Sequence, residues 1–335
     1  MEKKEKTFKI LAIDGGGIKG LFSAKIIQHF EETYNCYISD YFDLICGTST
    51  GGILALALSQ KIKASEICDL YEKKGKIIFP KQHPFIAKYK QYVKGGKYSS
   101  KPLETALIET FGNRCIGDSH NLLCIPAYSI TDSKACVFKY DHNANNSVHN
   151  RDNSLKCVDV ALATSAAPTY FPIVEMGDKI GKHLVDGGVF SNNPSIVGLI
   201  EAIRFFVGTG KDYTNAKILS ISSLKKPNGE SHTINKNRAF FDWKEKIFDV
   251  FTDSQEEFHS FLLKTIHESQ DLPFEYYRVP SPIIPSDQVK FVQMDKATDE
   301  VIKFLINKGN EVGNSFKNDK DIKHFFEEYK TFKIK

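Results

Sequence analysis

The chain lacks long hydrophobic runs. Its most apolar stretch, GGILALAL at 51–58, is far shorter than the roughly 20 apolar residues that a membrane-spanning helix needs. The N-terminus is basic, but the apolar residues behind it stop at Asp14 and no small-residue cleavage site follows. The sequence therefore predicts neither a transmembrane helix nor a secretory signal peptide, and we expect a cytoplasmic protein.

Paired cysteines and a strong net charge are also missing. The seven cysteines are an odd number and include no C-x-x-C pair, whereas disulfide frameworks and zinc sites depend on such pairs. We therefore expect free, buried thiols and no metal site. The net charge of +4 is small for 335 residues and is spread along the chain. It favours an anionic lipid surface only weakly and does not indicate nucleic acid.

Apolar and aromatic residues make up 41% and 12% of the chain, which is enough for a sizeable core. A strand is predicted over 8–13, a helix over 18–33 and a buried strand over 41–47, followed at once by another helix. This β-α-β-α order predicts an α/β fold of three layers, with a mainly parallel central sheet between helices. Further predictions are a surface loop over 141–154, a helix over 100–111 and strands over 121–130, 135–140, 183–188 and 216–222.

The last third of the chain, about 235–335, is predicted to be mainly helical. The whole chain, 1–335, is predicted to form a single domain whose core region lies at about 8–225. Apolar residues recur close to one helical face at Phe240, Trp243, Ile247, Phe251, Phe258 and Leu262. Packing of this face onto the sheet is favoured over an exposed, lipid-facing edge.

A glycine-rich turn follows the first predicted strand, in FKILAIDGGGIKGLFSA at 8–24. Such a turn before a helix exposes backbone N–H groups to a negative charge, either a dinucleotide pyrophosphate or the oxyanion of acyl transfer. Gly15, Gly17 and Gly20 match the G-x-G-x-x-G pattern of dinucleotide-binding folds. Those folds place an acidic residue at the end of the second strand, but this strand ends in CGTS, which disfavours a dinucleotide-binding protein.

A candidate nucleophile follows the second predicted strand. Gly47, Ser49 and Gly51 form G-x-S-x-G between a strand and a helix, the context of a nucleophile elbow. The glycines are needed because the turn is too tight for a Cβ on either side.

The base that would activate this serine is not evident from the residues alone. An α/β-hydrolase triad would need a histidine, and the downstream candidates His183, His259 and His267 lie in no motif. Asp186 ends a predicted strand and precedes Gly187 and Gly188, a pattern that by itself is typical of an ordinary turn.

Three stretches taken together resemble the patatin-like phospholipase family. They are DGGGIKG at 14–20, GTSTGG at 47–52 and DGGVFSNNP at 186–194. ATSAAPTYFP at 163–172 resembles another family stretch, and weaker similarity continues into MDKATDEVIKFLINKG at 294–309. The resemblance covers about 8–225 well. One departure is LSISSLK at 219–225, where family members often carry an SLGTG-like segment.

The resemblance implies a three-layer patatin-like fold and a lipid acyl hydrolase of the phospholipase A type with a Ser-Asp dyad. Asp186 would accept the proton of Ser49 directly, and no metal, calcium or other cofactor would be required. Backbone N–H groups of Gly15, Gly16 and Gly17, together with Thr50, would form the oxyanion hole. Lys19 would add positive charge, although a solvated lysine is the commoner case at a helix start.

The resemblance also implies partners. Some compact bacterial members serve antiviral defence and are activated by cyclic nucleotides, so we expect a phospholipid membrane as substrate, a cyclic nucleotide as candidate activator, and candidate self-assembly into a homo-oligomer. A solvated basic face is favoured over phosphate contacts for the basic residues that follow the catalytic region, which are Lys211, Lys217, Lys225, Lys226, Lys236, Arg238, Lys244 and Lys246.

Overall fold

The computed structural model describes residues 6–81, 96–142, 152–226, 236–237, 240–270 and 272–334. Within them an eight-stranded sheet has the order β5-β6-β3-β2-β1-β7-β8, with β4 paired to β3. Strands β3, β2, β1, β7 and β8 pair in parallel, whereas β4, β5 and β6 join in antiparallel pairs. The strands are β1 (Thr7–Ile13), β2 (Leu44–Gly47), β3 (Leu122–Ser129), β4 (Lys134–Lys139), β5 (Val174–Met176), β6 (Lys182–Asp186), β7 (Asn215–Ile221) and β8 (Phe274–Val279).

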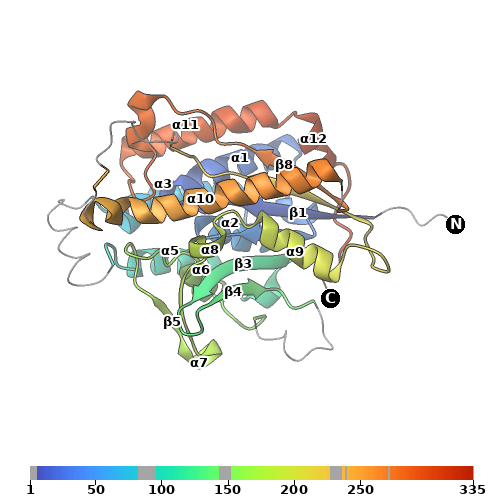
Figure 1. Ribbon diagram of the computed structural model, residues 1–335, viewed down its shortest axis with the longest axis horizontal. Coiled ribbons are helices and arrows are strands. Elements are labelled where there is room, and N and C mark those ends of the chain that lie inside the picture. The colour runs from blue at the N-terminus through green and yellow to red at the C-terminus, as the bar shows by residue number, and fades with distance from the viewer. Residues whose placement is uncertain are drawn as a thin grey trace.

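Helices cover both faces of this sheet, so the predicted three-layer α/β fold with a mainly parallel sheet is confirmed (Figure 1). The longer helices are α1 (Gly20–Thr33), α2 (Thr50–Ser59), α3 (Ala64–Ile78), α5 (Lys101–Phe111), α6 (Cys157–Thr164), α9 (Ser195–Phe205), α10 (Phe240–Ser269) and α11 (Asp299–Phe316). The short ones are α7 (Gly177–Ile180), α8 (Gly188–Ser191), α12 (Lys320–Lys323) and the 3-10 helices η1 (Gly17–Lys19), η2 (Ile38–Asp40), η4 (Ile116–Asp118), η5 (Ser286–Phe291) and η6 (His324–Phe326).

The central strands are apolar on both faces because helices pack on each. Residues 8–13 of β1 are all buried. Gly198 of α9 packs against Ile10 and Cys46, whereas Gly52 of α2 packs against Ile125. Cys46 pairs with Cys124, so Ile125 points to the other face, and α2 and α9 lie on opposite sides. Near-continuous apolar strands are typical of such doubly covered sheets.

The sequence located most elements of the first two thirds, but β2 is shorter than predicted and β5 was missed. The last third is mainly helical, as expected, but 274–279 form an additional strand, β8, parallel to β7. Only Phe274 and Val279 of β8 are buried, so this edge strand carries no continuous apolar run. Most of the predicted loop at 141–154, namely 143–151, lies outside the described residues.

Helix α10 has its apolar face outward, which corrects the expectation that this face packs onto the sheet. Four of the six apolar positions are between 42% and 58% exposed, namely Trp243, Ile247, Phe251 and Phe258. Leu262 is half-buried, and the side chain of Phe240 lies outside the described residues. Figure 1 shows α10 running across the front of the molecule.

The inward face of α10 is partly polar. Thr252 and Glu256 are buried beside the apolar Leu263. Glu256 can be buried because it forms ion pairs with Arg278 of β8 and with Lys225. The helix therefore has the apolar face that was predicted, but the face that lies inside is the one whose Glu256 forms ion pairs.

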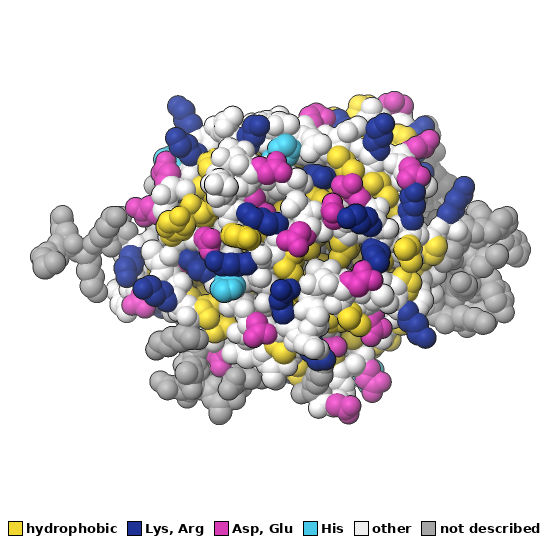
Figure 2. Space-filling view, turned by 180° about the vertical axis from the view of Figure 1, so that it is seen from behind, with side chains coloured by type: hydrophobic (Ala, Val, Ile, Leu, Met, Phe, Trp, Pro, Cys, Tyr) yellow, Lys and Arg dark blue, Asp and Glu magenta, His cyan; other side chains and the backbone are white. Residues whose placement is uncertain are grey.

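The surface and the thiols agree with the compositional analysis. Basic and acidic side chains are interspersed over the face shown in Figure 2. Within the described part of the chain, no helix is long and apolar enough to cross a bilayer. All seven cysteines are free thiols, and six of them are buried.

Candidate active site

Ser49 lies at a strained turn between β2 and α2. Its φ of 56° and ψ of −124° lie in a region that residues with a side chain rarely adopt. A Cβ on Gly47 would lie 2.0 Å from the carbonyl oxygen of Gly51, and a Cβ on Gly51 would lie 2.2 Å from that of Ile13. The turn can therefore form only with glycine at both flanking positions, as the nucleophile-elbow pattern predicts.

Asp186 is brought to Ser49 by the end of β6. The Oγ of Ser49 donates a hydrogen bond of 2.6 Å to Asp186 Oδ2, while Asp186 Oδ1 accepts one of 2.7 Å from the N–H of Gly188. A Cβ on Gly187 would lie 2.3 Å from the carbonyl oxygen of Pro126 in β3. The two glycines thus allow the close backbone approach that aims the carboxylate at the serine.

The environment of Asp186 shifts its acidity. The side chain is almost fully buried, and loss of hydration raises its pKa to about 7, against the opposing effect of the hydrogen bonds from Ser49 and Gly188. A carboxylate with a pKa near neutrality is a stronger base than an exposed one, and it lies within hydrogen-bond reach of a hydroxyl. The pair can therefore exchange a proton directly.

The glycine loop lies against the nucleophile. A Cβ on Gly15 would lie 3.2 Å from the Cβ of Ser49, so the first glycine is needed for this contact. The N–H of Gly15, however, already donates to the carbonyl oxygen of Asn192. The expectation that Gly15 donates to an oxyanion is therefore corrected, because its N–H is occupied. Gly16 and Gly17 have N–H groups without a hydrogen-bond acceptor in the described part of the chain.

The loop is held in place from its other side. Gly17 has a φ of +61°, and a Cβ there would lie 2.2 Å from the carbonyl oxygen of Met294. The same carbonyl accepts a hydrogen bond from the N–H of Ile18. Gly20, the last glycine of the loop motif, packs against Thr50 at the start of α2. The N–H of Thr50 lies at the N-terminus of this helix, where backbone N–H groups have no partner within the helix.

Two residues that support the site, Thr164 and Asn192, were not predicted from the sequence. Thr164 Oγ1 accepts a hydrogen bond from the N–H of Ser49 and donates one to the carbonyl oxygen of Pro126. Asn192 supplies the carbonyl that binds Gly15. Both lie in stretches that carry the family resemblance, ATSAAPTYFP and DGGVFSNNP, so the signal was present without an assigned role.

A buried charge network connects the glycine loop to α10. Asp14, the residue before Gly15, lies 2.5 Å from the guanidinium of Arg278, which also lies 2.6 Å from Glu256. Burial would raise the pKa of Glu256, but the positive charges of Arg278 and Lys225 lower it. No sequence pattern indicates this network, because Arg278 lies in β8, a strand that was not predicted.

The three candidate histidines make their contacts elsewhere. His183 contacts Thr131, His259 contacts the carbonyl oxygen of Asn193, and His267 contacts that of Phe274. Among the described residues, none of the three forms a hydrogen bond with the serine or the aspartate. The geometry therefore favours a dyad over a histidine triad.

Among the described basic residues after the catalytic region, some side chains are exposed and others pair with acidic residues. Lys217 pairs with Glu275, Lys226 with Asp249, and Lys225 with Glu256 and Glu257, while Lys211 binds the carbonyl oxygen of Ile203. Lys236 is exposed, and the side chains of Arg238, Lys244 and Lys246 lie outside the described residues. Within the described ranges, no group of three side chains suited to a metal ion is found.

Lys19 lines a small polar cavity beside Gly15 and Gly16. Burial lowers its pKa, while the charges of Asp253 and Asp249 oppose this shift. The expectation of a freely solvated lysine is therefore wrong, because the loop and α10 enclose the side chain.

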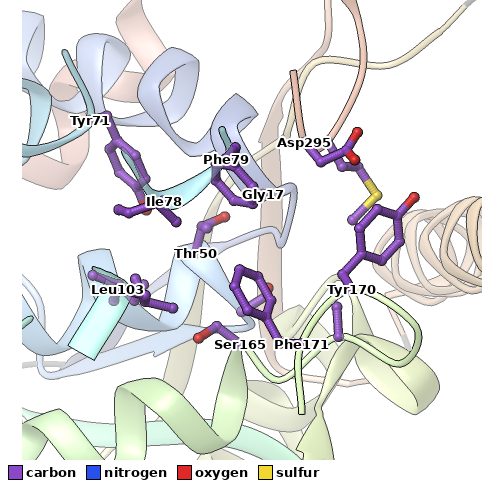
Figure 3. Close-up of a pocket in the computed structure, with 14 residues that line it drawn as sticks. Gly17, Thr50, Tyr71, Ile78, Phe79, Leu103, Ser165, Tyr170, Phe171 and Asp295 are labelled. Carbon is purple, nitrogen blue, oxygen red and sulfur yellow. The ribbon is translucent and has the colours of Figure 1, made fainter. Parts of the chain in front are cut away.

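The space above Ser49 is small. A cavity of about 30 Å³ is lined by Ser49, Thr50 and mainly apolar side chains, which is room for about one or two water molecules. Figure 3 shows Phe171 pointing into this cavity, with Tyr170 and Asp295 together on one side. Asp295 forms an ion pair with Lys97 and accepts a hydrogen bond from the hydroxyl of Tyr98. These contacts connect Asp295 to the segment at 97–98.

The chain is similar to several known proteins. The family model described as patatin-like phospholipase matches residues 11–197, more than half of the chain. A "cGAMP-activated phospholipase" of Pseudomonas aeruginosa is 30% identical, with 91% of this chain and 87% of the relative covered. The protein of that name from Vibrio cholerae is 29% identical, with 97% and 96% covered. Among solved structures, VipD from Legionella pneumophila has a TM-score of 0.44 at 12% identity, over 94% of this chain and 67% of its own.

The charge network yields a test of stability. Arg278→Met leaves the buried Asp14 carboxylate without its cation, so we expect a loss of about 3–5 kcal/mol in the free energy of unfolding, measured by urea denaturation. The double variant Asp14→Asn/Arg278→Met should lose less, because no unpaired charge remains buried. As a control, Lys217→Met breaks the half-exposed pair with Glu275 and should cost about 1 kcal/mol or less. Equal losses in Arg278→Met and Lys217→Met would contradict a structural role for the network.

Proposed function

Because the chain belongs to the patatin-like phospholipase family and is a lipid acyl hydrolase, we propose that it cleaves ester bonds with a dyad of Ser49 and Asp186. The observation that carries the proposal is the 2.6 Å hydrogen bond from the serine hydroxyl to the buried carboxylate. Neither residue has a histidine partner among the described residues, so Asp186 is the base in direct reach. The substrate class is a phospholipid or a related lipid ester.

The reaction then proceeds in two steps. Asp186 accepts the hydroxyl proton while Ser49 Oγ attacks the ester carbonyl, and the tetrahedral intermediate collapses as the leaving alcohol takes up that proton. Asp186 next removes a proton from water as the water oxygen attacks the acyl-enzyme, and it returns that proton to Ser49 Oγ as the second tetrahedral intermediate collapses to the fatty acid and the free serine. The dyad supplies both nucleophile and base, so the proposal requires no cofactor.

The oxyanion is assigned to three backbone donors. The N–H groups of Gly16 and Gly17 have no acceptor among the described residues, and Thr50 directly follows the nucleophile at the N-terminus of α2. Such preorganised donors stabilise the charge that develops only in the transition state. The ammonium of Lys19, which lines the cavity beside Gly16, adds to the positive potential of the loop.

The dyad is tested by substituting its two residues and the three candidate histidines one at a time. Ser49→Ala and Asp186→Asn should each lower kcat for ester hydrolysis by about 10³-fold or more, because they remove the nucleophile and the base. His183→Ala, His259→Ala and His267→Ala should retain substantial activity, since none contacts the dyad. The assay is hydrolysis of phospholipid vesicles and of a soluble ester, with circular dichroism to verify folding. A folded, inactive histidine variant would restore the triad hypothesis.

The raised pKa of Asp186 gives the reaction a pH dependence. The carboxylate must be deprotonated to act as base, so kcat/KM should rise with pH through an apparent pKa of about 7 and level off above it. An exposed aspartate would instead give a profile that is flat above about pH 5. The His259→Ala variant is the control, and loss of the pH 7 transition in that variant would assign the transition to the histidine.

We propose that the enzyme is a cytoplasmic antiviral effector that contacts the membrane peripherally and is activated by a cyclic nucleotide. The relatives are named for activation by cGAMP, and they match this chain along most of their length. The small cavity at Ser49 supports a low basal activity, because a volume of about 30 Å³ does not admit a lipid. An unregulated phospholipase in the cytoplasm would attack the membrane of its own cell. A ligand activates such an enzyme by binding the active state more tightly than the inactive one.

Activation is measured on the purified protein with and without cGAMP and a panel of other cyclic di- and trinucleotides. We expect phospholipid hydrolysis to rise at least ~10-fold with one of them, as a preference of about 1.4 kcal/mol for the active state would give. Light scattering in the same samples tests whether activation accompanies assembly into a homo-oligomer. Full activity in the bare protein, unchanged by every ligand and by protein concentration, would leave a constitutive lipase.

A further inference from the structure

The outer face of α10 carries an exposed apolar stripe. Its members are between 42% and 66% exposed, and their spacing places them along one face of the helix. They are Ile247, Val250, Phe251, Phe258 and Phe261, which we call the outer stripe. Figure 1 shows α10 on the outside of the molecule, in front of the sheet.

The outer stripe cannot be buried within one copy of the chain. Gln255 on the inward face donates to the carbonyl oxygen of Val189, and Glu256 pairs with Arg278, so turning the helix over would break these contacts. A large apolar or aromatic side chain has roughly 150–250 Å² of surface, so the exposed parts of the stripe amount to about 500 Å². A contiguous apolar patch of this size on a folded chain marks an interaction surface.

The outer stripe is arranged symmetrically about Ser254, a small exposed residue at its centre. Ile247 and Phe261 lie seven residues to either side of Ser254, and Val250 and Phe258 lie four residues to either side. When two such helices cross antiparallel at Ser254, Phe261 of each meets Ile247 of the other, and Phe258 of each meets Val250. Each ring then faces a smaller side chain, an arrangement that interdigitates without voids, and the small residue at the crossing allows close approach.

We propose that the outer stripe is a self-association surface, through which two copies of this chain pair with their α10 helices antiparallel about a two-fold axis. Covering the stripe in both copies removes about 1,000 Å² from water, which reaches the size that a specific interface needs. The interface is isologous, because the same patch of each copy meets itself. Pairing of this kind goes beyond the proposed function and does not depend on the ester chemistry.

A lipid surface fits this face of α10 less well. Helices that lie on membranes are rich in Lys and Arg on their polar face, whereas the sequence of α10 holds seven acidic residues and three basic ones. Asp253 and Glu257 are exposed beside the stripe, and their carboxylates would be repelled by anionic headgroups. The outer stripe itself carries no charge, so it is suited to the matching stripe of a second copy.

Sedimentation velocity over a series of protein concentrations tests the surface. Phe258→Asp and Phe261→Asp should each raise the dissociation constant of the pair at least ~30-fold, because a carboxylate enters the apolar centre of the interface twice, once from each copy. Both rings are exposed, so their replacement leaves folding intact, which circular dichroism verifies. The matched control is Ile200→Asp on α9, which is 58% exposed and lies outside the stripe. It should pair like the wild type.

A wild-type chain that stays monomeric up to about 100 µM would overturn the proposal. Pairing that Phe258→Asp and Phe261→Asp leave unchanged would do the same, because it would use another surface. If Phe261→Asp abolished binding to vesicles of phosphatidylglycerol and phosphatidylethanolamine but left pairing unchanged, the stripe would be a membrane surface instead. No ester substrate enters the sedimentation measurement, so failure of the proposed ester chemistry would not affect its result.

Cysteine cross-linking tests the antiparallel register. Ser254→Cys places a thiol at the crossing point, where the Cα atoms of the two copies come within the ~7 Å that a disulfide requires, so mild oxidation should give a covalent dimer. The control is Glu268→Cys, also exposed on α10 and fourteen residues from Ser254. Its two copies would lie about 40 Å apart in the antiparallel pair but side by side in a parallel one.

The wild-type chain measures any cross-linking by the native cysteines, six of which are buried. A covalent dimer of Ser254→Cys alone would support the proposed pairing. Cross-linking of Glu268→Cys, or none in Ser254→Cys beyond the wild-type level, would overturn the register.

Discussion

The site depends on close approach of backbone segments at the edge of the sheet where the parallel strands end. The turn after β2 packs against the end of β1, because Gly51 lies on the carbonyl oxygen of Ile13. The glycine loop after β1 packs in turn on Ser49, and the turn after β6 packs on Pro126 of β3. A side chain at any of these glycines would push the segments apart by ångströms. Ser49, Asp186 and the free N–H groups meet because no side chain stands between them.

Dehydration of this region accounts for its chemistry. The same packing that brings Asp186 to Ser49 removes water from the carboxylate and raises its pKa to about 7. Asp14, one residue before the loop, is equally buried, and burial raises its pKa to about 7 as well, but it is paired with Arg278. The two aspartates therefore differ in role through their partners: one faces a hydroxyl that it can deprotonate, and the other faces a permanent cation that holds it in place.

Helix α10 shows how one buried charge can decide the orientation of an element. Its apolar stripe would be expected inside, yet Glu256 is inside because Arg278 and Lys225 satisfy its charge. Gln255 and His259 on the same helix bind the carbonyl oxygens of Val189 and Asn193, next to the turn that carries Asp186. The inward face thus supports the catalytic turn and the glycine loop through polar contacts, and the apolar residues are left exposed. Helix α10 is therefore connected both to the turn that carries Asp186 and to the glycine loop.

The sequence alone determined the parallel core, the elbow at Ser49 and the turn at Asp186, because local patterns carry each of them: apolar runs for strands, and glycines where the backbone must bend sharply. It also identified the family, since three such patterns occur in the right order. Tertiary structure decided what depends on partners distant in the chain. The N–H of Gly15 is taken by Asn192, 177 residues away, and Arg278 selects the inner face of α10 from a strand that has no continuous apolar run. The hydrogen bond that occupies the N–H of Gly15 and the raised pKa of Asp186 both follow from contacts between distant segments, and no local pattern in the sequence records them.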